Sequence, residues 1–85
     1  MFELTNRVAV ITGGANGIGR ETARTFARAG ATVVVWDMAE DLGQTVAGEI
    51  EAGGGLAAFF RVNVTSQTDV NATTSATLER FRNEN

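Results

Sequence analysis

Short apolar runs alternate with segments of helical periodicity along the whole of this 85-residue chain. The runs are continuous and rich in β-branched or aromatic residues, as in strands buried on both faces; they are residues 7–12 (RVAVIT), 32–36 (TVVVW) and 55–62 (GLAAFFRV). Because short connections separate the runs from the helical segments, the alternation predicts parallel strands joined by right-handed crossovers. The expected fold class is α/β with the order β-α-β-α-β-α, and Trp36 and Phe59–Phe60 are interpreted as core residues.

Three segments have the periodicity of amphipathic helices: residues 18–29, residues 39–52, and a segment that starts near Ser66. Gly30 and the triple glycine at 53–55 are predicted to end the first two. Ser66, followed three residues later by Asp69, has the spacing of a capping box at the start of the third. The predicted inward stripes are Ile18, Thr22 and Phe26 (with Ala23 and Ala27 beside them), then Leu42, Val46 and Ile50, then Val70, Thr74, Leu78 and Phe81.

Charge and composition argue against several classes of partner. The net charge is −3 and no basic block is present, which argues against nucleic acid or an anionic membrane. No stretch approaches the roughly 20 apolar residues of a membrane span, and the N-terminal residues lack the pattern of a secretory signal. We therefore predict a cytoplasmic protein. With no Cys in the chain, disulfides and thiolate chemistry are excluded, and no metal site is predicted.

Glycines are concentrated in the segment VAVITGGANGIGRETA (residues 8–23), at the junction of the first predicted strand and the first predicted helix. A glycine at the strand end permits a tight turn, one at the helix start lets backbone N–H groups approach a ligand, and a third lets helix and strand pack closely. Gly13, Gly17 and Gly19 have these positions. The helix N-terminus adds unpaired N–H donors and partial positive charge, which suit a pyrophosphate.

Asp37 directly follows the second predicted strand, where a dinucleotide site needs a carboxylate to accept hydrogen bonds from the adenosine ribose. The same carboxylate would repel a 2′-phosphate, and Met38 beside it offers no cation to compensate. The sequence therefore favours NAD over NADP as cofactor. The alternative is that Asp37 only caps the helix that begins near Ala39.

The stretch TGGANGIG (residues 12–19) resembles the Thr-Gly-x-x-x-Gly-x-Gly cofactor motif of the short-chain dehydrogenases/reductases, and the spacing fits methyltransferase or flavin-binding domains poorly. VVVWD and VNVT resemble the family's acidic position after the second strand and its adenine-flanking segment after the third. The resemblance implies a truncated, Rossmann-like doubly wound sheet, with residues 1–85 forming part of a dinucleotide-binding domain. It further implies that the cofactor contacts are Gly13, Asn16, Gly17, Ile18 and Gly19 at the pyrophosphate and ribose, Asp37 at the adenosine ribose, and Asn63 and Val64 at the adenine.

Asn63 departs from the family pattern, which usually has Asp before this Val. An amide oxygen can still accept a hydrogen bond from the adenine amino group. The alternative is that Asn63 is simply a turn residue before the Ser66 cap.

The family's chemistry, as the resemblance implies it, uses a Ser, a Tyr that acts as general acid/base, and a Lys four residues after the Tyr. This chain contains no Tyr and no Lys, and Arg is not a substitute because its proton is effectively never released near neutral pH. We predict no catalytic residue and no hydride transfer by this chain alone. Three hypotheses stay open: an NAD-binding half of an oxidoreductase, an enzyme part completed by other residues, or a structural or interaction fragment that keeps the fold without a cofactor.

The family's sheet begins in the order 3-2-1-4, so the strand at residues 7–12 is expected to lack a neighbour on one side. An apolar strand edge of this kind can pair with another chain. We therefore predict self-association through the exposed first strand.

Overall fold

The computed structural model of the chain describes residues 4–81. The elements in chain order are β1 (Val8–Thr12), α1 (Gly17–Arg28), β2 (Thr32–Asp37), α2 (Glu40–Ala52), β3 (Leu56–Arg61) and α3 (Gln67–Phe81). The order and type of all six predicted elements are confirmed, and the predicted bounds differ from these by no more than one residue.

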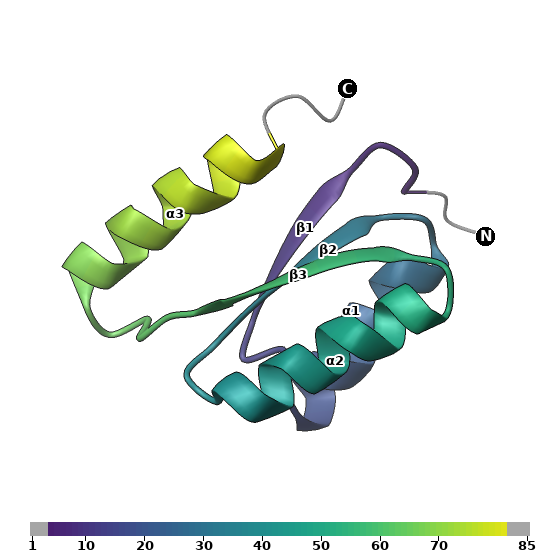
Figure 1. The fold of residues 1–85 in the computed structure, drawn as a ribbon, viewed down its shortest axis with the longest axis horizontal. Coiled ribbons are helices and arrows are strands. Elements are labelled where there is room, and N and C mark those ends of the chain that lie inside the picture. The colour runs from purple at the N-terminus through teal and green to yellow at the C-terminus, as the bar shows by residue number, and fades with distance from the viewer. Residues whose placement is uncertain (1–3, 82–85) are drawn as a thin grey trace.

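The three strands form one parallel sheet in the order β1-β2-β3, so β2 is the central strand of the described residues. α1 and α2 lie on one face of the sheet and α3 lies on the other (Figure 1). This is the doubly wound α/β arrangement that the sequence predicts, reduced to three strands. No helix among residues 4–81 has both the length and the apolar character needed to cross a membrane.

The core consists of two clusters, one on each side of β2. Val33 and Val35 pack with α1 and α2, whereas Val34 and Trp36 pack with Val62 and α3. Because side chains alternate between the faces of a strand, the continuous apolar sequence of β2 supplies both clusters. The prediction that Trp36 belongs to the core is confirmed, and both phenylalanines of β3 pack against these clusters.

The predicted inward side of α1 is correct at Ala23 and Ala27, which pack in the core, and wrong at the larger side chains. Ala23 is the fully buried residue of this helix, while Ile18 is 88% exposed and Phe26 is 36% exposed. The physical reason is the close approach of α1 to the loop after β1: a Cβ on Gly19 would collide with the backbone of Gly13. A helix this close to its neighbours has room only for small residues on the inward side, so the larger side chains point outward.

The stripe of α2 is correct at two of its three predicted positions. Val46 and Ile50 are buried, but Leu42 is 47% exposed. Gly43 takes the inward position instead, because the ring of Phe59 occupies the space that a Cβ at residue 43 would need.

The stripe of α3 is correct at its two ends, where Val70 and Phe81 pack against the core cluster of Val34, Trp36 and Val62. Its two middle positions are shifted by one residue. Thr73 and Thr77 are buried, whereas the predicted Thr74 and Leu78 are exposed. The shift follows from one hydrogen bond: the buried indole N–H of Trp36 donates to Oγ1 of Thr77 at 3.3 Å. A hydroxyl on the inward face therefore satisfies a donor that would otherwise be buried without a partner.

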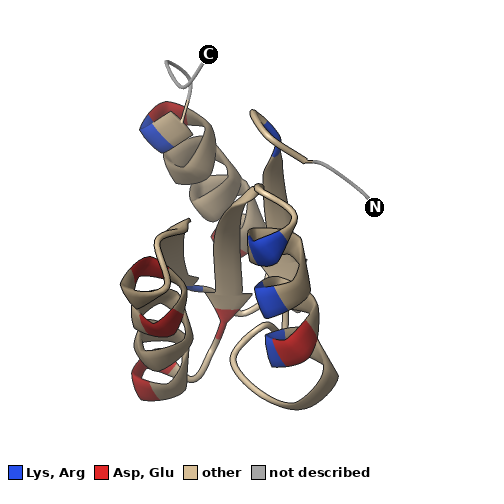
Figure 2. Ribbon diagram, turned by 90° about the vertical axis from the view of Figure 1, so that its right-hand side faces the viewer, with Lys and Arg blue, Asp and Glu red and all other residues tan. Residues whose placement is uncertain are grey.

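Charged side chains divide between the two helices that share a face. Arginines gather on α1 and carboxylates on α2 (Figure 2). One ion pair, between Arg20 and Glu49, connects the two helices. The side chain of Arg20 is therefore turned toward α2.

Candidate functional site

The carboxyl ends of the three strands lie side by side at one edge of the sheet. Thr12 is level with Trp36 on the neighbouring strand, and Asp37 is level with Arg61. The loop of residues 13–16 follows β1 at this edge. The structure therefore brings the predicted site residues to one edge: Gly13, Asn16, Gly17, Ile18, Gly19, Asp37, Asn63 and Val64.

The glycines of the loop are required for two different reasons. Gly13 and Gly17 have φ angles of +67° and +56°, a backbone region that residues with a side chain rarely adopt. Apart from the adjoining residues and the backbone of α1 itself, no atom lies within 4 Å of a Cβ built at either position, so the space beside them is open. Gly19, by contrast, is needed for close packing on the loop.

The N-terminus of α1 points its unpaired donors at this open space. Asn16 is the N-cap residue, yet its side chain makes no capping hydrogen bond, and the first turn carries no acidic residue. The first N–H groups of a helix have no partner within the helix, and the helix dipole makes this end favourable for an anion. Ile18 projects into solvent beside it.

Both carboxylate oxygens of Asp37 already accept a backbone hydrogen bond. Oδ1 accepts from the N–H of Ala39 at 2.9 Å, and Oδ2 accepts from the N–H of Ala15 at 3.2 Å. The first bond agrees with the local role that was the alternative interpretation. The second ties the glycine loop to the end of β2, a contact over 22 positions that no sequence pattern reveals. A carboxylate has about four acceptor sites, so roughly two stay available for ribose hydroxyls.

Asn63 forms a compact turn with its neighbours. Its Oδ1 accepts from both the backbone N–H and the hydroxyl of Thr65, at 3.0 and 2.6 Å. Both lone pairs of the amide oxygen are therefore in use, which supports the turn interpretation of Asn63. Val64 follows Asn63 in the chain, and Met38 follows the last residue of β2. Both side chains are 54% exposed and offer apolar surface at the carboxyl ends of the strands.

Asp69 is a residue whose role the sequence analysis identified only in part. The hydroxyl of Ser66 accepts from the N–H of Asp69 at 3.2 Å, which confirms Ser66 as the cap of α3. In a capping box the carboxylate of Asp69 would accept from the N–H of Ser66. Here it accepts from the N–H of Asn63 at 2.7 Å. Asp69 thereby holds the turn after β3 against the start of α3.

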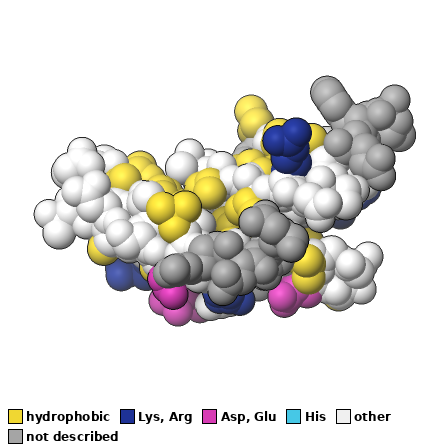
Figure 3. Space-filling view, turned by 90° about the horizontal axis from the view of Figure 1, so that it is seen from above, with side chains coloured by type: hydrophobic (Ala, Val, Ile, Leu, Met, Phe, Trp, Pro, Cys, Tyr) yellow, Lys and Arg dark blue, Asp and Glu magenta, His cyan; other side chains and the backbone are white. Residues whose placement is uncertain are grey.

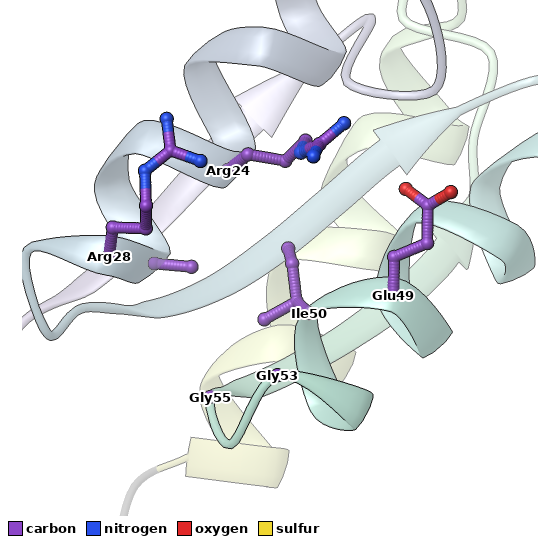
Figure 4. Close-up of a pocket in the computed structure, with 7 residues that line it drawn as sticks. Arg24, Arg28, Glu49, Ile50, Gly53 and Gly55 are labelled. Carbon is purple, nitrogen blue, oxygen red and sulfur yellow. The ribbon is translucent and has the colours of Figure 1, made fainter.

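One hollow of the described surface lies away from this edge. A groove of about 320 Å³ runs between the last turns of α1 and α2, with Arg24 and Arg28 on one side and Glu49 and Ile50 on the other (Figure 4). None of the predicted site residues lines it. Among residues 4–81 no group of acidic, His or Cys side chains is placed to hold a metal ion.

Comparison with known proteins identifies the family. The model of the short chain dehydrogenase family matches residues 7–83. This chain belongs to the short-chain dehydrogenase family. The resemblance drawn from TGGANGIG is thus confirmed.

Curated family members resemble the chain over a limited part of their length. Short-chain dehydrogenase reductase 4 of Arabidopsis thaliana is 46% identical over 91% of this chain, which corresponds to 25% of that protein. The 2,5-dichloro-2,5-cyclohexadiene-1,4-diol dehydrogenase of Sphingobium indicum is 44% identical over 92% of this chain and 31% of its own length. The chain therefore spans about a quarter to a third of these relatives.

Solved structures of the family superpose well. A hydroxysteroid dehydrogenase from Escherichia coli matches with a TM-score of 0.89 and 40% identity, over 92% of this chain and 32% of that one. A metagenomic short-chain oxidoreductase in complex with NADP matches with a TM-score of 0.87 and 31% identity, over 91% of this chain and 35% of that one. The truncated Rossmann-like fold is confirmed.

Proposed function

We propose that this chain is the dinucleotide-binding part of a short-chain dehydrogenase-type oxidoreductase, with residues 1–85 forming part of the binding domain. The observation that carries the proposal is the open, glycine-lined space at the N-terminus of α1, beside Asp37. In it the pyrophosphate would receive hydrogen bonds from the first N–H groups of α1, and Gly13 and Gly17 would allow it to approach the backbone. When bound, a nicotinamide cofactor would supply or accept the hydride.

The adenosine half of the cofactor would extend toward β2 and β3. The free acceptor sites of Asp37 suit two ribose hydroxyls, and Val64 and Met38 supply exposed apolar surface for the adenine. Because the amide oxygen of Asn63 is engaged with Thr65, its contribution to adenine binding would be limited to its NH₂ group.

We propose that the site prefers NAD to NADP. A 2′-phosphate would lie against the Asp37 carboxylate, and two negative charges in contact repel each other. The complex of a metagenomic relative with NADP makes a direct comparison of the two cofactors necessary. We also propose that the chain alone does not transfer hydride, since it has neither Tyr nor Lys to act as the proton donor and its activator. A cytoplasmic location and self-association through β1 belong to the same proposal.

A second candidate function has specific support. Both oxygens of Asp37 and the amide oxygen of Asn63 already accept hydrogen bonds within the chain, as they would in a structural or interaction fragment that keeps the fold without binding a cofactor. The two functions differ in their response to dinucleotide.

Isothermal calorimetry of the 85-residue chain with NAD and with NADP separates them. We expect weak NAD binding and weaker NADP binding, and a loss of NAD binding in Gly17→Val with the circular dichroism spectrum retained. Gly48→Val, on the exposed side of α2 and open to solvent, is the matched control and should bind as the parent chain does. If millimolar NAD gave neither a binding heat nor a shift in melting temperature, the structural or interaction function would be the better supported of the two.

A further inference from the structure

We propose that Asn16 is a site of spontaneous deamidation. The backbone nitrogen of Gly17 displaces ammonia from the side-chain amide of Asn16, and water then leaves an aspartate or an isoaspartate at the N-terminus of α1. The modification itself is independent of the dinucleotide proposal. Its consequence, a progressive loss of anion binding at this helix end, rests on the proposed function.

Asn16 differs from the other asparagines of the chain in the residue that follows it. It is the only asparagine that precedes a glycine, whereas Asn63 precedes Val and Asn71 precedes Ala. The attacking atom is the backbone nitrogen of the next residue, so a side chain on that residue hinders its approach to the amide carbon. Glycine has no side chain and the freest backbone. Asn16 therefore has the least hindered neighbour of the asparagines in this chain.

The two reacting groups of Asn16 and Gly17 are not held by other groups. The side chain of Asn16 makes no capping hydrogen bond. Among residues 4–81 the N–H of Gly17 has no hydrogen-bond partner either. Asn16 is exposed to solvent, and the space beside Gly17 is open apart from the adjoining residues and the backbone of α1. The amide and the nitrogen are therefore free to approach each other, and water has access to them.

The backbone of Asn16 must turn before the two groups meet. Its ψ angle is 170°, whereas the ring that forms needs the side chain and the next nitrogen on the same side of the Cα–C bond. Among the described residues the carbonyl of Asn16 accepts one hydrogen bond outside regular elements, from the N–H of Arg20 at 3.1 Å, and the rotation breaks it. Helices fray at their ends, and no side-chain cap holds this turn closed.

The N-terminus of α1 also favours the charges that develop during the reaction. Its partial positive charge stabilises a negative charge on the deprotonated nitrogen of Gly17 and on the amide oxygen of the tetrahedral intermediate. The N–H groups of Ile18 and Gly19, which have no partner among residues 4–81, are the donors that a side-chain oxygen at an N-cap position meets. The helix end therefore promotes the attack as well as permitting it.

The reaction is redox-neutral, and water is its only co-reactant. A bond forms between the nitrogen of Gly17 and Cγ of Asn16, the bond from Cγ to the amide nitrogen breaks, and ammonia leaves with the proton of the Gly17 N–H. Water then opens the cyclic imide. Attack at Cγ leaves aspartate, whereas attack at the backbone carbonyl carbon leaves isoaspartate, in which the main chain runs through Cβ and Cγ of residue 16.

Either product adds a carboxylate to a region that has few negative charges. The first turn of α1 holds no acidic residue. Carboxylates gather on α2 (Figure 2), and uncharged and hydrophobic side chains prevail on the face seen from above (Figure 3). A carboxylate at residue 16 would accept hydrogen bonds from the N–H groups proposed for the pyrophosphate and would repel that anion. We expect the modified chain to bind NAD at least about tenfold more weakly.

Mass spectrometry after trypsin digestion tests the modification. The chain has no Lys, so cleavage after Arg places Asn16 in the peptide 8–20 and both Asn63 and Asn71 in the peptide 62–80. The amide oxygens of these two internal controls accept hydrogen bonds from Thr65 and Gln67. After incubation of the folded chain in mildly alkaline buffer, we expect residue 16 to convert roughly tenfold faster than either control. Equal rates would overturn the proposal.

Two variants separate the helix end from the dipeptide. Leu42→Asn places the same Asn-Gly sequence on the exposed side of α2, where the N–H of Gly43 donates to the carbonyl of Ala39 at 2.9 Å. We expect residue 42 to convert more slowly than residue 16 of the same chain, and equal rates would contradict the role of the N-terminus of α1. Asn16→Gln keeps an amide but requires a larger ring, so residue 16 should then stay unmodified.

Calorimetry with NAD tests the consequence on fresh and on incubated chain. We expect the affinity of the parent chain to fall as residue 16 converts, and incubation to leave the response of Asn16→Gln unchanged. A converted chain that binds NAD as tightly as the fresh chain would overturn the loss of anion binding. If fresh chain bound no NAD, the dinucleotide proposal would fail, and the mass spectra would still decide the modification.

Discussion

The glycines after β1 illustrate what single residues decide in this molecule. Positions 13 and 17 require glycine because of their backbone conformation, and both border open space. Position 19 requires glycine because it lies against the loop backbone. Their positions, and hence the loop, could be predicted from the spacing in TGGANGIG. The reason for each could not, because it depends on how closely α1 approaches the loop.

Gly19→Ala is expected to destabilise the fold by about 1–3 kcal/mol, the usual cost of adding a methyl group where no space exists. Gly48→Ala is the matched control in α2: its Cβ meets no atom within 4 Å, so the gain in helix propensity should stabilise the chain by up to about 1 kcal/mol. Urea unfolding followed by circular dichroism measures both. Equal shifts of the same sign would contradict the packing argument.

Asp37→Asn tests whether the carboxylate serves both the loop and the ribose. The amide has one acceptor oxygen, so it cannot keep the separate bonds to Ala15 and Ala39, and we expect a loss of about 1 kcal/mol in unfolding free energy. Removing the negative charge should also reduce the preference for NAD over NADP roughly tenfold. Calorimetry with both cofactors gives the ratio; an unchanged ratio would mean that Asp37 acts on the loop alone.

At the scale of elements, the sequence predicts the six segments well and their buried faces less well. Continuous apolar runs and glycine stops are local signals, so strand and helix bounds follow from them. The inward side of a helix depends on its distance from the sheet, which favoured Ala23 over Ile18 in α1 and Gly43 over Leu42 in α2. In α3 a polar partner for Trp36 decided the face, and a hydrophobic pattern cannot reveal such a partner.

Thr77→Val is expected to weaken the docking of α3. The substitution keeps the side-chain shape but leaves the buried Trp36 N–H without its acceptor, which costs about 1–3 kcal/mol. Thr74→Val, on the exposed side of the same helix, is the control and should change stability little. Trp36 is the only tryptophan, so its fluorescence during urea unfolding reports the docking directly; equal midpoints for both variants would argue against this role of the hydrogen bond.

At the scale of the whole molecule, the two proposed binding surfaces lie at different places on the same sheet. The dinucleotide would bind across the carboxyl ends of the strands, whereas the proposed self-association would use β1. A chain of this size buries only about 60–70% of the surface of its unfolded form, so its free energy of unfolding is expected to be small. Each binding event should therefore raise that free energy measurably. Either partner stabilises the folded state by mass action.

The two effects should therefore separate in thermal unfolding. We expect the melting temperature of the parent chain to rise with protein concentration and, independently, with NAD concentration. In Val10→Lys the dependence on protein concentration should fall while the NAD effect persists, because Val10 is half-exposed on β1 and a charge on an edge strand opposes pairing. Gly17→Val should show the reverse, with dimerisation retained and the NAD effect lost. If Val10→Lys kept its fold and lost both effects, cofactor binding would require the paired form, and the strand ends of one copy would not suffice to hold a dinucleotide.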